Sequence, residues 1–168
     1  MMLPDVLSHG DKYWMTYTMR HWIALCEASP PDPTANAKFR AWFGDSKVVD
    51  ASGRPLVVYH GTDTEFTSFD RKRAIGSQFW FTSSRDKIES GDVGANASGV
   101  ILEVYLSIQN PAGWPEYENL MIAQIRSRGY DGIILPEADE RTYIVFDPRQ
   151  IKSIHNKSFN PRTSHLRR

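Results

Sequence analysis

The hydrophobic positions of the chain form short runs separated by polar turns. The runs at 56–62, 78–82 and 100–108 are rich in β-branched and aromatic side chains, which predicts strands. Shorter runs of the same kind lie at 132–135, 143–146 and 150–154. Six or more short strands with only two or three helices predict an α+β fold in which most strand pairs are antiparallel.

Helical spacing and proline content suggest how the chain is divided. Apolar residues recur at helical intervals over residues 11–28, and prolines crowd residues 29–34. We therefore expect an N-terminal helix and Pro-rich linker over 1–36, whose apolar face packs on the domain or on a partner. The main domain should span 37–155. Residues 156–168 are basic, which predicts a flexible tail, with a nucleic-acid patch as the alternative.

Charge and composition narrow the classes of function. The 168 residues carry 20 basic and 20 acidic side chains, a formal net charge of +0, so no overall field favours nucleic acid or an anionic membrane. Cys26 is the single cysteine and the five histidines are scattered, which predicts no disulfide and no metal centre. No apolar run reaches membrane-spanning length, and the first residues lack the pattern of a signal peptide. We expect a cytoplasmic protein without a membrane partner.

The run at 56–62 ends on a polar corner, His60-Gly61-Thr62. A glycine at the exit of a strand lets a ligand approach the backbone, and a neutral histidine offers one donor and one acceptor. This is one way to build a small-molecule site. The alternative is an ordinary turn with His60 as an exposed cap.

Several segments together resemble the ADP-ribosyltransferase-like domains of phage polyvalent proteins. They are FRAWFGDSKVVD at 39–50, PLVVYHGT at 55–62, GYDGII at 129–134, YIVFDPRQIKS at 143–153 and SFNP at 158–161. The family is similar to the diphtheria-toxin and poly-ADP-ribose-polymerase branch. The resemblance implies a split fold of two mostly antiparallel sheets around an NAD cleft, with NAD as co-substrate and no metal.

The resemblance also implies which residues bind NAD. His60 takes the position of the histidine that bonds the adenosine ribose, Gly61 that of the glycine whose backbone binds the nicotinamide amide, and Thr62 the following Ser/Thr position. Trp80 stands where the family has a tyrosine, and Phe81 follows it. An indole can stack on nicotinamide as a phenol ring does.

The position of the family's catalytic glutamate is occupied by Thr142, directly before the run at 143–146. A carboxylate there would stabilise the positive charge that builds on the ribose, whereas a hydroxyl supplies no charge. Glu140 lies two residues upstream, on the same face of an extended chain. We take Thr142 and Glu140 as the candidate catalytic residues, with Glu140 contacting the acceptor or acting as a displaced acid. A solvated acidic loop is the alternative for Glu140.

Three functions are compatible with these residues. The first is a mono-ADP-ribosyltransferase that modifies an unidentified protein acceptor, as a phage-derived effector against a host factor would. The second is a binding module that keeps the pocket, lacks the chemistry and blocks a partner, which the absent glutamate favours. The third is transfer to nucleic acid, for which the basic tail is the support.

Overall fold

The computed structural model describes residues 32–63, 66–91, 99–156, 159–164 and 166. The expected N-terminal helix at 11–28 lies outside them. The helices are α2 (Ala37–Phe43), α3 (Arg85–Glu89), α4 (Trp114–Asn119) and α5 (Ile122–Ser127), with 3₁₀ turns η1 (Pro33–Ala35), η2 (Ile75–Ser77) and η3 (Pro148–Gln150). The strands are β1 (Val58–Thr62), β2 (Phe79–Thr82), β3 (Val100–Leu106), β4 (Pro111–Ala112), β5 (Gly132–Pro136), β6 (Arg141–Val145) and β7 (Ile151–Ser153).

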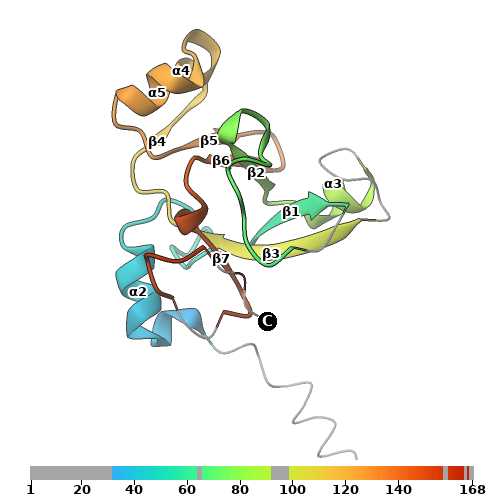
Figure 1. The fold of residues 1–168 in the computed structure, drawn as a ribbon, viewed down its shortest axis with the longest axis vertical. Helices are drawn as coiled ribbons and strands as arrows, with labels where there is room; N and C mark the ends of the chain where they lie inside the picture. Colours follow the sequence, from blue (N-terminus) through green and yellow to red (C-terminus); the bar gives the residue numbers. More distant parts are fainter. Residues whose placement is uncertain (1–31, 64–65, 92–98, 157–158, 165, 167–168) are drawn as a thin grey trace, which may run out of the picture.

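The strands form one mixed sheet in the order β4-β5-β6-β2-β1-β3-β7, so the fold is α+β. The β4–β5 pair is parallel and the other pairs are antiparallel. Two sheets were expected, and the hydrogen-bonded order instead runs through all seven strands. However, β1 and β2 are joined by a single register pair, Tyr59 with Thr82. The sheet therefore consists of two halves, β4-β5-β6-β2 and β1-β3-β7, that diverge from this point (Figure 1).

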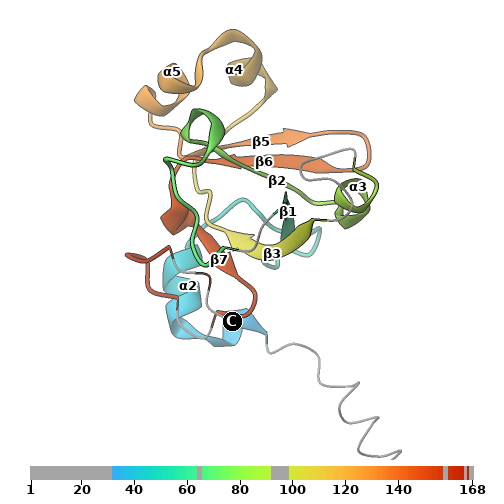
Figure 2. The same cartoon turned by 45° about the vertical axis from the view of Figure 1, so that its right-hand side comes forward.

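Each half buries one face because side chains alternate along a strand. Phe79 and Phe81 of β2 pack with Val58 of β1 and Tyr143 of β6 in the largest core cluster. A second cluster, which includes Ile133 of β5, lies under the helices α4 and α5. Figure 2 shows these helices at the β4–β5 end of the sheet, away from β1 and β3. No helix in the described part of the chain is long and apolar enough to cross a membrane.

The helix α2 has a clear cause for each of its ends. The Asn36 side chain accepts hydrogen bonds from the first backbone N–H groups, and Gly44 ends the helix with a φ of +54°. An added Cβ at Gly44 would lie 2.7 Å from Nε2 of Gln109, so a side chain at this position would need rearrangement as well as an unfavourable φ. The helix thereby holds its aromatic face against Tyr105 of β3.

The C-terminal segment differs from the expected flexible tail where the structure describes it. Phe159 is 4 % exposed and packs edge-on against Phe39 of α2. The Lys152 ammonium, on β7, donates to the carbonyl oxygens of Asn160 and Thr163. Burial of one aromatic ring and the hydrogen bonds to a buried ammonium offset the cost of ordering these residues.

Candidate functional site

A cavity of about 380 Å³ opens where β1 separates from β2. Beyond Tyr59, no residue of β1 is paired with β2 in the described part of the sheet. The cavity is lined by His60 and Thr62 of β1, by Phe66, Ser68, Phe69, Asp70, Arg73 and Ala74 of the following segment, and by Gln78, Phe79 and Trp80 at the start of β2. The predicted His-Gly-Thr corner therefore borders a hollow large enough for part of a nucleotide-sized ligand.

His60 is held in one orientation by β2. Its Nδ1 lies 2.8 Å from the carbonyl oxygen of Trp80. A carbonyl oxygen can only accept, so we assign the proton to Nδ1. Burial lowers the pKa of the imidazole, which favours the neutral ring, while the hydrogen bond to Trp80 opposes that shift. In the neutral ring, Nε2 then carries a lone pair that can accept a hydrogen bond from a ligand hydroxyl.

Trp80 and Phe81 are adjacent on β2 but face opposite ways. The indole of Trp80 is 42 % exposed and meets the ring of Tyr117 on α4 edge-on, and Trp80 is one of the residues that line the cavity. Phe81 is 2 % exposed within the main core cluster, although its ring lies 5.3 Å from the His60 ring. A ligand can therefore reach the Trp80 side chain, whereas Phe81 supports the His60 ring from behind.

Gly61 and Thr62 are the last two residues of β1, where this strand is no longer paired with β2 in the described part of the sheet. Gly61 pairs with Ile101 of β3 and has no partner residue on β2 in the described strands. Thr62 lines the cavity together with His60. The cavity wall therefore includes three of the five residues that the resemblance implies contact NAD: His60, Thr62 and Trp80.

Thr142 is not part of the cavity wall, but it lies close to it along the sheet. It pairs with Thr82 of β2, two residues after Trp80, and with Leu135 of β5. Positions two apart on a strand share a face and are separated by about 7 Å. The hydroxyl of Thr142 donates to Oε1 of Glu137 at 3.2 Å. Thr142 is thus in contact with a carboxylate that comes from the neighbouring strand end.

In the second candidate acid, Glu140, each of the two carboxylate oxygens has a partner. Its Oε2 accepts from the hydroxyl of Thr82 at 3.0 Å, and its Oε1 lies 3.4 Å from the ammonium of Lys87 on α3. The Glu140 side chain is only 9 % exposed. These contacts engage both carboxylate oxygens of Glu140, whereas Glu137 is exposed.

Sequence reasoning missed Glu137 and Gln78. Glu137 follows β5, and the backbone hydrogen bond from its N–H to the carbonyl of Glu140 closes the β5–β6 hairpin. The register of β5 against β6 places Glu137 beside Thr142. This register depends on where each strand ends, which the sequence pattern did not indicate. Oε1 of Gln78 is buried without a hydrogen-bond partner among the described residues, and Gln78 lines the cavity. Such an oxygen is a ready acceptor for a ligand donor.

Residues 50–121 match the family described as ADP-ribosyltransferase in polyvalent proteins. The chain is similar to that family over this stretch. The match confirms the type of domain that the sequence resembles and supports ADP-ribosyl transfer as the general activity. It covers His60, Trp80 and the whole of the cavity wall, while Thr142 and Glu137 lie beyond it.

Neither the search of curated proteins nor the search of solved structures found a match. Within the residues that the structure describes, no group of three or more His, Cys, Asp or Glu side chains is placed to hold a metal ion.

Proposed function

We propose that the protein is an NAD-dependent mono-ADP-ribosyltransferase that modifies a protein acceptor. One observation carries the proposal: within the segment that matches the family, His60 is fixed by its Nδ1 contact to the carbonyl oxygen of Trp80, and both residues line one cavity. We take His60 as the hydrogen-bond acceptor for a ribose and Trp80, whose indole is 42 % exposed, as the aromatic group for nicotinamide.

The residues of the cavity wall support NAD as the co-substrate. Nε2 of His60 would accept from a ribose hydroxyl, and the exposed indole of Trp80 would stack on the nicotinamide ring. The guanidinium of Arg73, in the cavity wall, would offset the charge of the diphosphate. Gly61 would offer its backbone to the nicotinamide amide, as the family resemblance implies.

The transfer step requires a carboxylate beside the ribose. The N-glycosidic bond breaks, nicotinamide leaves with the bonding electrons, and the acceptor's nucleophilic atom forms a new bond to the same ribose carbon. We assign the carboxylate to Glu137, which Thr142 orients through its hydroxyl. In this role Glu137 would stabilise the cationic ribose and take the proton that the acceptor loses. Glu140 would position Thr82 and β2.

Transfer of one ADP-ribose, and not of a chain, is proposed because Thr142 takes the position at which the family resemblance implies a glutamate. We further propose that the protein acts in the cytoplasm, and that a phage-derived effector against a host protein is its biological setting. This setting is analogy from the family alone.

A second candidate is a binding module that retained the pocket and lost the chemistry. The observation that favours it is Thr142 itself, which supplies no charge where the family has a glutamate. Transfer to nucleic acid is a third candidate, and the described part of the tail weakens it because Phe159 packs on the domain.

Incubation of the purified chain with labelled NAD and a cell lysate tests these candidates. Label in protein that survives nuclease and is absent from a His60→Ala variant is the expected result. Nuclease-sensitive label would identify a nucleic-acid acceptor. If the wild-type chain binds NAD in calorimetry but neither transfers nor hydrolyses it, the binding-module candidate replaces the enzyme.

A further inference from the structure

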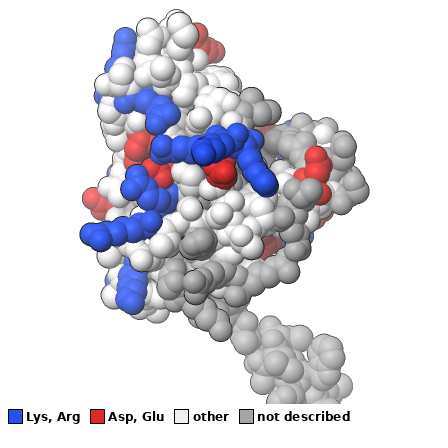
Figure 3. Space-filling view, in the orientation of Figure 1, with Lys and Arg blue, Asp and Glu red and all other residues white. Residues whose placement is uncertain are grey.

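A second hollow, of about 450 Å³, lies away from the candidate NAD cavity and shares no lining residue with it. Three arginines reach it from separate parts of the chain: Arg71 from the segment before η2, Arg126 from α5 and Arg149 from η3. We call it the arginine hollow. The rest of its wall is Trp42, Ser107, Tyr130, Asp131, Phe146, Asp147, Gln150 and Pro161. In Figure 3, basic side chains gather across the middle of the molecule on one face.

The charges of the arginine hollow do not balance. Arg71 and Arg149 share one carboxylate, that of Asp147, at 2.8 Å and 2.6 Å. The hydrogen bond from Arg149, with help from Arg71, holds the pKa of Asp147 below its usual range. Arg126 lies over the ring of Phe146, 5.5 Å from its centre. None of the described carboxylates lies within ion-pair distance of Arg126.

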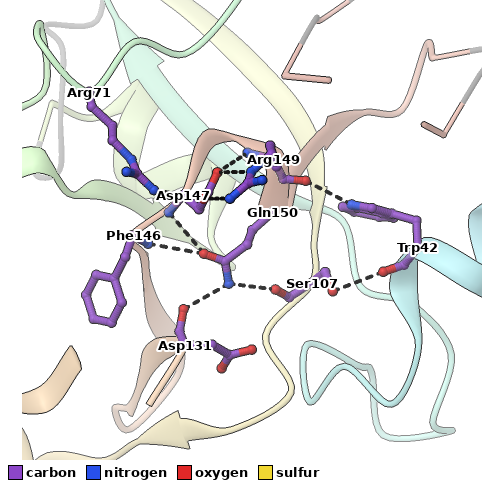
Figure 4. Close-up of polar contacts among 8 residues, drawn as sticks. All are labelled: Trp42, Arg71, Ser107, Asp131, Phe146, Asp147, Arg149 and Gln150. Atoms are coloured by element: carbon purple, nitrogen blue, oxygen red, sulfur yellow. Dashed lines mark hydrogen bonds and ion pairs between the residues drawn. The ribbon is translucent and has the colours of Figure 1, made fainter. Parts of the chain in front are cut away.

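Asp131, the other acid in the wall, is already bound. Its two oxygens accept from the backbone N–H groups of Gln109 and Asn110, each at 2.8 Å. Figure 4 shows the Asp131 carboxylate across Gln150 from the pair formed by Asp147 and Arg149. Three cations therefore face one shared carboxylate and one carboxylate directed to the backbone, in a chain with a formal net charge of +0.

The frame of the hollow is fixed before any ligand arrives. The side-chain amide of Gln150 accepts from the backbone N–H groups of Phe146 and Asp147 and donates to the carbonyls of Ser107 and Asp131 (Figure 4). The indole N–H of Trp42 donates to the carbonyl of Arg149 at 2.9 Å. All four hydrogen-bonding positions of the amide are used, so η3 is locked to β3 and to the chain before β5.

We propose that the arginine hollow binds a phosphate group. A guanidinium has five N–H donors, and Asp147 uses only part of those of Arg71 and Arg149. The remaining donors, with those of Arg126, exceed what one carboxylate can accept. A phosphate has more acceptor oxygens and a greater charge, so it matches a site of three arginines better. Asp147 acts as the group that holds two guanidinium planes in position.

Two sources can supply this phosphate: a free phosphate or nucleotide, and the backbone of a single-stranded nucleic acid. The proposal does not depend on NAD chemistry, because no residue of the hollow lines the NAD cavity. NMR titration of the labelled chain with inorganic phosphate, with pyrophosphate and with a short DNA oligonucleotide separates the sources. Binding by the small anions identifies the first, and binding by the oligonucleotide alone identifies the second.

Substitutions localise the binding. Arg126→Gln should weaken the response to the bound probe by about ten- to a hundredfold, as loss of a charged hydrogen-bond donor does. Arg128→Gln is the matched control. Arg128 lies two residues after Arg126, at the C-cap of α5, and lines neither cavity, so this variant should bind like the wild type. Arg73→Gln, in the NAD cavity, should also leave this response unchanged. The affinity of Arg126→Lys should lie between those of the wild type and Arg126→Gln, because lysine keeps the positive charge but lacks the planar set of N–H donors of the guanidinium.

Several outcomes would overturn the proposal. These are no response to any phosphate probe, equal losses in Arg126→Gln and Arg128→Gln, or binding of an acidic peptide without binding of phosphate. Should Arg126→Gln not fold, the amide shifts of the wild-type chain decide: shifts at residues 126, 147 and 149 support the site. Shifts confined to residues 60–80 place the anion in the NAD cavity and refute the site.

Discussion

The hydroxyl of Thr142 donates a hydrogen bond to Oε1 of Glu137 at 3.2 Å. Thr142, to which the resemblance assigns the glutamate position of the family, thus touches a glutamate from the adjacent strand end. The hairpin between β5 and β6 makes this possible, because Thr142 pairs with Leu135, two residues before Glu137. Thr142 of β6 carries no carboxylate, but the Glu137 carboxylate, directly after the neighbouring strand β5, is in contact with it.

The first prediction separates the two acids. Glu137→Gln should lower NAD turnover about a hundredfold, since a carboxylate that stabilises charge in the transition state is worth this much. Glu140→Gln should reduce turnover less, because the amide can still accept from Thr82. NAD affinity by calorimetry should stay the same in Glu137→Gln, which excludes a folding defect. A larger loss of turnover in Glu140→Gln would reverse the assignment.

The second prediction concerns stacking at the exposed indole. Trp80→Ala should weaken NAD binding by about 1–3 kcal/mol, and Trp80→Tyr should restore most of it. Trp114→Ala is the matched control, because Trp114 is 37 % exposed and also meets Tyr117 but does not line the cavity. Calorimetric titration with NAD measures all three. Equal weakening in Trp80→Ala and Trp114→Ala would show that the aromatic cluster, and no stacking contact, determines binding.

The third prediction is a pH dependence of stability that originates at His60. Burial lowers the pKa of this histidine in the folded state, so below the ordinary histidine pKa of about 6.5 the unfolded chain binds more protons. The stabilisation that the neutral ring provides is complete above that pH. It is lost as the pH falls toward the lowered pKa of the folded state. The free energy of unfolding should therefore decrease as the pH is lowered from about 7.5 to 5.5.

His60→Asn is the control for this dependence, because it keeps an N–H near the carbonyl of Trp80 and cannot titrate. Urea unfolding at the two pH values should give a smaller decrease for His60→Asn than for the wild type. Asp147 and Glu116, whose pKa values are lowered by their hydrogen bonds, act at more acidic pH and do not interfere. An identical decrease in both proteins would assign the effect to another group.

Local sequence patterns predicted the strands that carry the candidate cavity. They did not predict contacts between side chains on different strands. The strand that carries His60 and the aromatic strand with Trp80 each depend on neighbours in the chain, and both are observed. Glu137 was missed because its partner depends on the length of a hairpin. The arginine hollow was missed because Arg71 and Arg126 come together only through the folded sheet.

The composition of the C-terminal segment does not indicate that one of its aromatic residues is buried. Basic and polar residues dominate 156–168, yet Phe159 finds a place among the aromatic rings of α2. Phe159→Ala should therefore lower the free energy of unfolding by about 3 kcal/mol, the usual cost of removing a buried ring. His155→Ala, at an exposed position, should change it by less than about 0.5 kcal/mol. Urea unfolding measures both, and equal stability of the two variants would return the segment to a flexible tail.

The last prediction asks whether Thr142 occupies the catalytic position. Thr142→Glu alone would place two carboxylates together, and repulsion between them would raise the pKa of one of the pair. One of the acids would then be protonated and the gain in activity would be small. The informative change is therefore Thr142→Glu combined with Glu137→Gln, which moves the single carboxylate from β5 to β6.

If the ribose binds beside Thr142, this double variant should hydrolyse NAD roughly ten- to a thousandfold faster than Glu137→Gln alone. Thr142→Gln combined with Glu137→Gln has the same length without the charge, and it should remain inactive. A fluorescent NAD analogue whose emission rises on hydrolysis gives the rates. If the carboxylate at 142 does not restore turnover while NAD affinity is intact, the ribose lies elsewhere, and the register taken from the family resemblance is wrong for this chain.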